Sequence, residues 1–301
     1  MKTALVLGGG GARGLAHLGV LKALENEGIR PDLIVGCSIG AIIGGMYAQN
    51  PDIKQVQERV RLFFESEHYQ DLNINVLERH RNGTENKDFI QQIARNTIRR
   101  VMLNLVVSRL SIMKAEKIDK VIDFLIDEGN IEDTKIPFAC NATDLSSGQP
   151  VLFREGNIRL AIKASSTIPG YLPPVKNDSQ LLVDGAVTFT LPVKFAKMLG
   201  ADFIIAVDVK QELKPQANFR NVFDVLLRAN AVTSSLFAAE VSRIADIIIT
   251  PPVGDFMWYD FKEIDWLISA GEEATLLRLK EINKKYRKGF FRRLFGSKTA
   301  A

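Results

Sequence analysis

The sequence predicts an α/β fold in which helices cover both faces of a mainly parallel sheet. Short apolar runs, typical of strands buried on both faces, alternate with stretches that carry apolar residues at helical spacing. With 301 residues, of which 46% are hydrophobic, the chain is long enough to bury one large core. The expected strands lie at 3–7, 33–37, 136–143, 150–153, 180–184, 202–209 and 246–250.

A glycine-rich run follows the first expected strand and opens a helix. Residues 8–14 read Gly-Gly-Gly-Gly-Ala-Arg-Gly, and the helix is expected from about Ala12 to Glu27, ending at Gly28. Such a loop presents backbone N–H groups to an anion. A bound phosphate and the oxyanion of an acyl-transfer reaction would both accept hydrogen bonds from these N–H groups.

A dinucleotide site is the alternative interpretation of this loop. Gly9, Gly11 and Gly14 satisfy the G-x-G-x-x-G pattern of dinucleotide-binding folds. Those folds place an acidic residue at the end of the second strand to hold the ribose, but residues 36–38 here are Gly-Cys-Ser. The sequence therefore favours an oxyanion over a dinucleotide.

The second expected strand leads into a G-x-S-x-G pattern at residues 36–40, and an apolar helix is expected after it. Strand, sharp turn and helix form the nucleophile elbow of serine hydrolases. Gly36 and Gly40 supply the small residues that so tight a turn requires. The helix that follows directs backbone N–H groups and a partial positive charge at the serine. We expect Ser38 to be the nucleophile of an acyl transfer.

A serine nucleophile needs a general base within hydrogen-bond reach. The three histidines fit this role poorly, because His17 lies among apolar residues of the first expected helix, whereas His68 and His80 lie in polar, irregular sequence. Asp184 ends an apolar strand and precedes Gly185, at the kind of strand end where catalytic groups of α/β sheets collect. A hairpin-turn aspartate is the alternative, but the other motifs favour Asp184 as the base.

With these motifs in this order, the chain resembles the bacterial patatin-like phospholipases. Their pattern comprises a G-G-G-x-[RK]-G loop, a G-x-S-x-G elbow and a D-G-[GA] segment. The resemblance covers residues 1–50 and 136–280 and includes the stretches 142–145, 164–170 and 260–271. It implies a patatin-like α/β fold and the hydrolysis of lipid acyl esters.

The resemblance also implies roles for individual residues. Ser38 and Asp184 would form a catalytic dyad that uses no histidine, no metal and no cofactor. The oxyanion hole would consist of backbone N–H groups, with the positive charge of Arg13 nearby. An arginine in the first turn of a helix is unfavourable for the helix dipole, so we expect Arg13 to bind an anionic substrate or orient the loop, with a solvated side chain as the alternative. The residues expected to form the hole are Gly9, Gly10 and Gly11. Cys37 stands where the family often has threonine or serine, and we expect it to be a buried, small apolar residue.

We expect one α/β domain over residues 1–283, with a helical insertion at about 51–135. The middle of the insertion, at 89–113, combines apolar residues at helical spacing with four arginines, which predicts amphipathic helices. A surface helix pair packed on the sheet and a lid that meets a lipid interface both fit this pattern.

The positive net charge of +4 arises largely from a C-terminal tail at 284–301, where basic residues alternate with aromatic ones. Basic side chains favour an anionic bilayer and aromatic ones insert at the headgroup level. We expect peripheral membrane contact through 284–298, with a solvated or disordered terminus as the alternative and without nucleic acid as a partner.

Two cysteines, both on expected strands, predict no disulfide framework, and the first strand begins without a separate apolar leader. We therefore expect a cytoplasmic protein, peripheral on the inner face of the membrane if the tail binds it. The expected function is cleavage of phospholipid or other lipid esters through an acyl-serine. The alternative is a lipid-binding regulatory protein that keeps the fold with little turnover.

Overall fold

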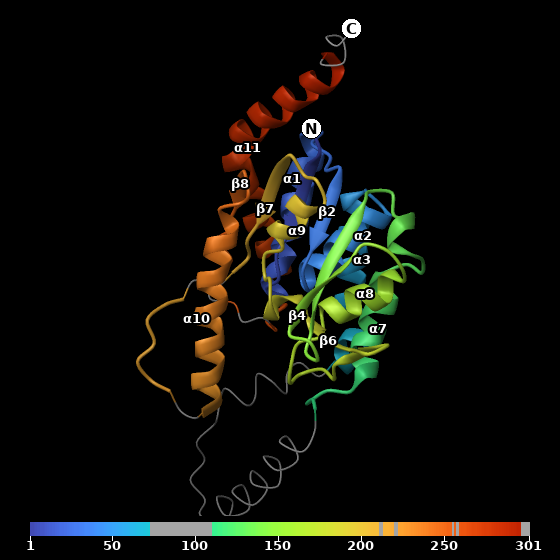
Figure 1. Cartoon of the computed structure of the whole chain (residues 1–301), viewed down its shortest axis with the longest axis vertical. Coiled ribbons are helices and arrows are strands. Elements are labelled where there is room, and N and C mark those ends of the chain that lie inside the picture. Colours follow the sequence, from blue (N-terminus) through green and yellow to red (C-terminus); the bar gives the residue numbers. More distant parts are fainter. Residues whose placement is uncertain (73–109, 211–212, 220–221, 255, 257–258, 296–301) are drawn as a thin grey trace, which may run out of the picture.

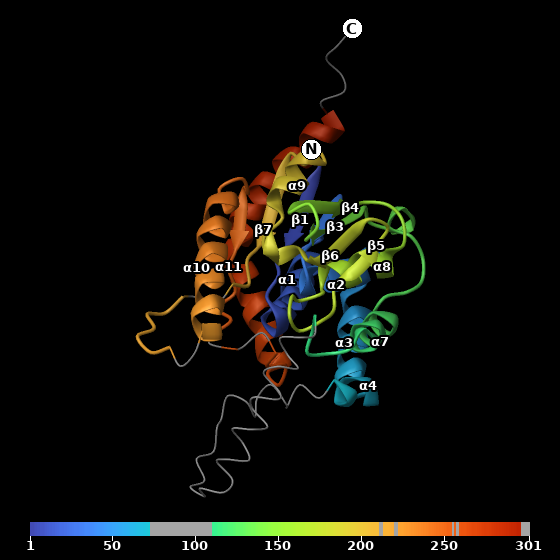
Figure 2. The ribbon, with the colours of Figure 1, turned by 60° about the horizontal axis from the view of Figure 1, so that its bottom comes forward.

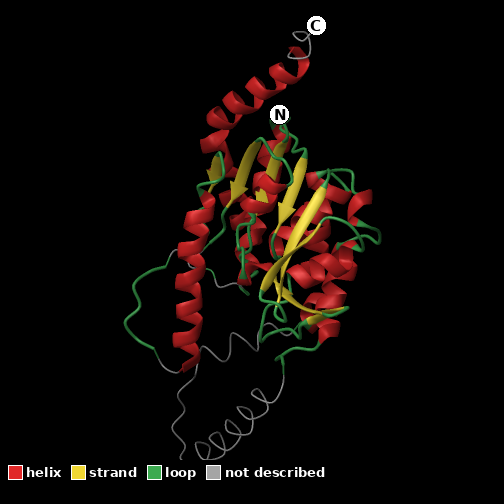
Figure 3. Cartoon of the chain, in the orientation of Figure 1, coloured by secondary structure: helices red, strands yellow, loops and turns green. Residues whose placement is uncertain are grey.

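An eight-stranded sheet forms the centre of the protein, and helices cover both of its faces (Figure 1). The structure, a computed structural model, describes residues 1–72, 110–210, 213–219, 222–254, 256 and 259–295. The strand order is β5-β6-β3-β2-β1-β7-β8, and β4 pairs with β3 off this path. The predicted α/β class is confirmed, as the layers in Figure 3 show.

The strands that carry the predicted motifs belong to the parallel part of the sheet or border it. β1 pairs in parallel with β2 and β7, β2 with β3, and β7 with β8, whereas β4, β5 and β6 form antiparallel pairs. The short strand β5 was not among the expected ones. The strands are β1 (Thr3–Leu7), β2 (Leu33–Gly36), β3 (Phe138–Asp144), β4 (Gln149–Phe153), β5 (Val175–Asn177), β6 (Gln180–Asp184), β7 (Phe203–Val207) and β8 (Ile247–Ile249).

The helices connect these strands and pack on the sheet (Figure 2). The first expected helix begins as a 3-10 turn, η1, and becomes an α-helix only at Ala16. The helical elements are η1 (Gly11–Leu15), α1 (Ala16–Asn26), α2 (Ile39–Gln49), α3 (Ile53–Glu65), α4 (Glu67–Asp71), α7 (Ala115–Leu125), η2 (Ile131–Asp133), α8 (Ile158–Ser165), η3 (Gly185–Val187), α9 (Val193–Met198), α10 (Val222–Ser242) and α11 (Ile264–Phe295).

Alternate residues of β1 enter two different apolar clusters, so the sheet is buried on both faces. Leu5 and Leu7 belong to a large cluster with residues of α1, α2, α3, α7, α8 and α11. Ala4 and Val6 belong to a second cluster, which includes residues of α9 and Val241 of α10. Strands buried on both faces carry mostly apolar side chains. Polar side chains at the ends of such strands are therefore candidates for a functional role.

The described parts of the predicted insertion are helical and pack into the large cluster. They comprise α3, α4 and α7, and Lys120 of α7 pairs with Asp71 of α4 at 2.9 Å (Nζ–Oδ2). Most of the predicted amphipathic stretch at 89–113, together with His80, lies outside the described residues. The insertion thus contributes to the core through the helices at its two ends.

Helix α11 runs from the 260–271 stretch to the predicted tail without a break at residue 283. Lys285 contacts the body of the protein, because its Nζ lies 3.6 Å from Asp246 Oδ1. The C-terminal end of α11 lies at the opposite end of the molecule from α4 and α7 (Figures 1 and 2). Among the helices that the structure describes, none combines the length and the apolar character that a membrane span requires.

Candidate active site

Ser38 lies in a strained turn between β2 and α2. Its φ of 54° and ψ of −124° place a residue other than glycine in the left-handed half of conformational space. The turn leaves no room for side chains at its flanks: a Cβ on Gly36 would lie 2.5 Å from Gly40 O, and one on Gly40 2.2 Å from Leu7 O. Both predicted elbow glycines are therefore required by close backbone contacts.

The hydroxyl of Ser38 donates a hydrogen bond to Asp184, with 2.6 Å between Oγ and Oδ2. The sheet explains how residues so far apart in sequence meet. β3 pairs with both strands, with Cys140 opposite Gly36 and Ala142 opposite Asp184. The ends of β2 and β6 therefore lie two residues apart along β3, and the structure brings together the two side chains predicted to form the dyad.

The carboxylate of Asp184 is buried, with 4% of the residue exposed. Burial raises its pKa to about 6, because a low-dielectric environment disfavours the charged form. Hydrogen bonds from Ser38 Oγ and from the backbone N–H of Ala186 (2.8 Å) act in the opposite direction. The group is thus ionised at neutral pH and is a stronger base than an exposed aspartate.

Cys37 is buried, but its thiol does more than fill space. Its Sγ lies 3.9 Å from Oδ1 of Asp184, on the oxygen that Ser38 does not use. Burial first and the negative charge of Asp184 second raise the pKa of the thiol far above its ordinary value. Cys37 is therefore a neutral, weak hydrogen-bond donor to the carboxylate.

One short segment at the end of α8 holds both Ser38 and Asp184 in place. The Oγ of Ser165 accepts the backbone N–H of Ser38 at 2.9 Å, and the backbone oxygen of Thr167 accepts the N–H of Asp184 at 2.8 Å. The stretch 164–170 is part of the family resemblance, but no role for these residues could be predicted from it. The signal in the sequence was weak, because hydroxyl residues such as Ser165, Ser166 and Thr167 are also typical of an ordinary helix end.

Asn141 fixes the turn after Asp184 and was also missed. Its side-chain Nδ2 donates to the backbone oxygens of Gly185 (3.0 Å) and Phe189 (3.1 Å). A Cβ on Gly185 would lie 2.3 Å from the backbone oxygen of Asn141, so a larger residue would displace the turn. The available signal in the sequence was an asparagine inside the expected strand 136–143, which the structure shows to be fully buried.

The glycine loop lies against Ser38. A Cβ on Gly9 would lie 3.4 Å from Cβ of Ser38, but the N–H of Gly9 is donated to Thr190 O at 2.9 Å. Of the three amides predicted to bind the oxyanion, this one is therefore already engaged, which leaves those of Gly10 and Gly11. Arg13 Nε donates to Gly10 O at 3.1 Å, so the guanidinium orients the loop.

The described histidines serve structural contacts. The Nε2 of His17 donates to Gly8 O at 2.8 Å, and burial lowers the pKa of the ring to about 4, so the ring is neutral at pH 7. His68 lies on the short helix α4 rather than in irregular sequence, and its ring contacts the edge of Phe124. Ser38 thus has Asp184, and not His17, as its hydrogen-bond partner.

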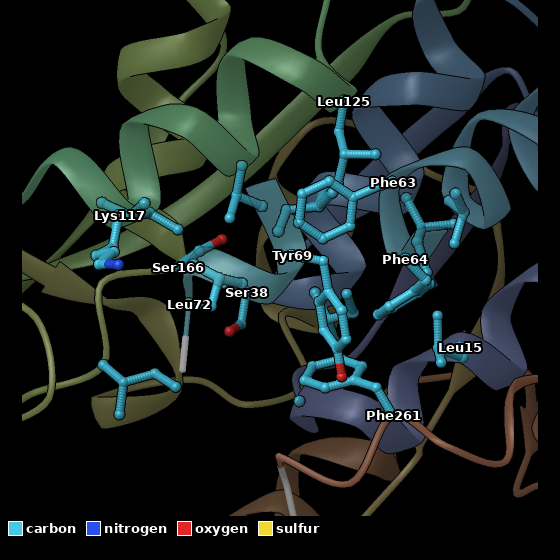
Figure 4. A pocket seen from close by; sticks show the side chains of 18 of the residues that line it. Leu15, Ser38, Phe63, Phe64, Tyr69, Leu72, Lys117, Leu125, Ser166 and Phe261 are labelled. Atoms are coloured by element: carbon cyan, nitrogen blue, oxygen red, sulfur yellow. The ribbon is translucent and has the colours of Figure 1, made fainter. Parts of the chain in front are cut away.

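An apolar cavity of about 170 Å³ opens beside Ser38 (Figure 4). Half of its lining residues come from α3, α4, α7 and their flanks, so the insertion builds one wall of the candidate site. The rings of Phe64, Tyr69 and Phe261 contact one another there. The lining residues are Gly11, Leu15, Ser38, Ile39, Ile42, Ile43, Val60, Phe63, Phe64, Tyr69, Leu72, Met113, Lys117, Ile118, Val121, Leu125, Ser166, Ile168, Leu172 and Phe261.

Within the part of the chain that the structure describes, no three His, Cys, Asp or Glu side chains gather closely enough to hold a metal ion. The candidate site combines a serine, a buried carboxylate, the amides of the glycine loop and an apolar cavity.

Comparisons with known proteins agree with the motifs. A lysophospholipase Nte1 of Emericella nidulans is 35% identical over 205 residues, which are 68% of this chain and 12% of that protein. The human patatin-like phospholipase domain-containing protein 6 is 33% identical over 208 residues, 68% of this chain and 13% of that protein. Among solved structures, VipD from Legionella pneumophila aligns with 93% of this chain and 66% of its own at 13% identity, with a TM-score of 0.44.

The chain spans only 12–17% of the length of the first curated relatives that it matches. The profile of the family described as patatin-like phospholipase matches residues 5–197, which include the glycine loop, the elbow and the Asp184 turn. The chain belongs to the patatin-like phospholipase family.

Proposed function

We propose that the protein hydrolyses acyl esters of lipids through an acyl-serine intermediate. The hydrogen bond of 2.6 Å from Ser38 Oγ to the buried carboxylate of Asp184 carries this proposal. A serine needs a base at this distance, and a base with a pKa of about 6 is matched to work near neutral pH. The relatives named as phospholipases or lysophospholipases support the choice of substrate class.

In the first half of the reaction, Asp184 Oδ2 takes the proton of the Ser38 hydroxyl while Oγ attacks the ester carbonyl carbon. The carbonyl electron pair moves onto oxygen, and the amides of Gly10 and Gly11 hold the resulting oxyanion. The bond to the alcohol then breaks. The leaving alkoxide takes the proton from Asp184, which releases a neutral alcohol and leaves the acyl group on Ser38.

In the second half, water attacks the acyl carbon and gives its proton to Asp184. Collapse of the tetrahedral species expels Ser38 Oγ, which regains the proton from Asp184, and the fatty acid leaves. The net result is one ester and one water converted into one acid and one alcohol. The same carboxylate serves as base and acid in both halves, so the cycle needs no metal or cofactor.

The cavity supports a substrate with a hydrocarbon chain. Ser38 lies at its edge, and most other lining residues are aliphatic or aromatic. A lined apolar cavity of about 150 Å³ is large enough to take up benzene, so this cavity accommodates several methylene groups of an acyl chain. Because α3, α4 and α7 form one wall, we propose that the insertion helps to select the acyl chain.

The pH profile of fatty-acid release tests this mechanism. With the pKa of Asp184 at about 6, kcat/KM on a short-chain ester is expected to rise about tenfold per pH unit below pH 6 and to level off above it. EDTA should leave the rate unchanged, since the base is a carboxylate. A protein that binds phospholipid vesicles but releases no fatty acid at any pH would instead be a lipid-binding regulatory protein.

We further propose that the basic end of α11 binds anionic membranes and so tethers the protein to them. Lipid would reach Ser38 through a different surface of the protein. The tether would lie at the end of the molecule opposite to the cavity wall formed by α4 and α7. A chain ending at Tyr286 keeps Lys285, which pairs with Asp246, and loses five basic residues. At about 1 kcal/mol for each, its binding to anionic vesicles should weaken by more than about 100-fold.

Vesicle sedimentation at low and high salt measures this loss. Turnover of a soluble short-chain ester is the control and should not change, because the described end of α11 lies opposite to the cavity wall formed by α4 and α7. Equal binding of the shortened and the full chain to phosphatidylglycerol vesicles would contradict the tether.

A further inference from the structure

Ser166 places an unpartnered hydroxyl in the cavity that Ser38 lines. The residue is 6% exposed, and its Oγ has no hydrogen-bond partner among the described residues. It lines the same cavity as Ser38, and Figure 4 shows both hydroxyl groups at that cavity. A buried hydroxyl without a partner costs free energy, so its retention needs an explanation.

The backbone around Ser166 is fixed by the catalytic pair itself. Its predecessor, Ser165, binds the N–H of Ser38, and its successor, Thr167, binds the N–H of Asp184. The N–H of Ser166 closes the end of α8 by donating to Lys163 O at 3.1 Å. Ser166 therefore sits between the two residues that hold the nucleophile and the base, in a segment with little freedom to move.

Other buried polar atoms lack partners in the described part of the chain, but they lie elsewhere. These are Nδ1 of His17, Oδ1 of Asn141 and Nε of Arg278, and none of these residues lines the cavity. Lys117 does line it, but its Nζ donates to the backbone oxygen of Asp71. The hydroxyl of Ser166 thus combines burial, an open hydrogen-bonding capacity and a place in the cavity that Ser38 also lines.

We propose that Ser166 is a substrate-binding residue whose Oγ–H donates a hydrogen bond to an oxygen of the bound acyl ester. An ester offers two oxygen acceptors and no donor, which matches a hydroxyl whose capacity to donate is unused. Because the N–H of Gly9 already donates to Thr190 O, the glycine loop offers one hydrogen-bond donor fewer to the substrate than its sequence predicts. The hydroxyl of Ser166 would add one donor to the site. This inference rests on the proposed function of the site.

The test compares Ser166→Ala with Ser165→Ala, two neighbouring changes that each remove one hydroxyl. Ser166→Ala is expected to lower kcat/KM for p-nitrophenyl butyrate by about 10- to 100-fold. Its urea midpoint should stay equal to that of the wild type or rise, because no internal hydrogen bond is lost. Ser165→Ala should lower both activity and the urea midpoint, because it frees the N–H of Ser38.

Ser166→Thr keeps the hydroxyl and should recover most of the activity that Ser166→Ala loses. A kcat/KM of Ser166→Ala within twofold of the wild type would overturn the inference. A fall in its urea midpoint as large as that of Ser165→Ala would do so too, since it would reveal a structural bond.

A second measurement does not need turnover. In the Ser38→Ala background, adding Ser166→Ala should weaken the binding of the same ester by about tenfold, measured by competition with a fluorescent fatty acid. If neither the binding nor kcat/KM changes, the inference about Ser166 is wrong while the proposed function of the site still stands. A wild-type protein without esterase activity would instead contradict the proposed function, whatever the binding measurement gives.

Discussion

Replacing Ser38 by alanine, or Asp184 by asparagine, is expected to lower the kcat of ester hydrolysis by about 10⁴-fold or more. Alanine removes the atom that forms the acyl intermediate. Asparagine is nearly the same size as aspartate but cannot take the proton of Ser38 Oγ, which lies 2.6 Å away. Fatty-acid release from a short-chain ester and from anionic phospholipid vesicles measures both losses.

The double variant provides a sharper test of the dyad. If Ser38 and Asp184 act as one unit, removing both should cost no more than removing either one. Ser269→Ala is the matched control, since this hydroxyl lies on the exposed face of α11 and donates only to Asp265 O. If the losses of kcat in the two single variants add up in the double variant, Asp184 acts independently of Ser38. Full activity in Asp184→Asn would exclude Asp184 as the base.

The meeting of Ser38 with Asp184 could be predicted from sequence because each residue is marked locally. Ser38 and Asp184 both follow an apolar strand and both have glycine neighbours that a tight turn requires. In the sheet, β3 pairs with both β2 and β6, and this brings the two side chains together. The rule that parallel strands gather their carboxyl ends at one edge of the sheet applies to β2 but not to β6, which runs antiparallel to β3. Asp184 reaches Ser38 because β3 pairs with β2 up to Cys140 and with β6 from Ala142 on.

The residues that support the dyad could not be predicted in the same way. The contact of Ser165 with Ser38 joins positions 127 residues apart, and nothing near Ser165 in sequence specifies its partner. The engaged amide of Gly9 is a similar case, because it depends on where Thr190 lies after the Asp184 turn. The predicted helical insertion at about 51–135 includes α3 and α7, but its sequence did not predict which residues of these helices would line the cavity.

Asp184→Asn is also expected to stabilise the fold at neutral and alkaline pH while it removes activity. Burial raises the pKa of Asp184 from its ordinary 3.8 to about 6, so the folded state holds this proton more tightly than the unfolded state does. Stability therefore falls as pH rises from about 4 to 6, and the full penalty is present above that range. Two pKa units correspond to about 3 kcal/mol in the free energy of unfolding.

Urea unfolding at pH 4 and pH 8 measures this effect. At pH 8 the variant should exceed the wild type by up to about 3 kcal/mol, and at pH 4 the difference should nearly vanish because the wild-type carboxyl is then protonated. The asparagine side chain that Asp184→Asn introduces can still accept the N–H of Ala186 through its oxygen, so the turn is kept.

Asp144→Asn is the control of opposite sign. Hydrogen bonds from Ser147 Oγ and from the backbone N–H of Leu181 lower the pKa of Asp144 to about 2, so its charged form stabilises the fold above pH 4. This variant should lose stability at pH 8 and lose less at low pH. If Asp184→Asn also lost stability at pH 8, the carboxylate would be a net stabilising group. The site would then not hold a base whose strength comes from the cost of burying its charge.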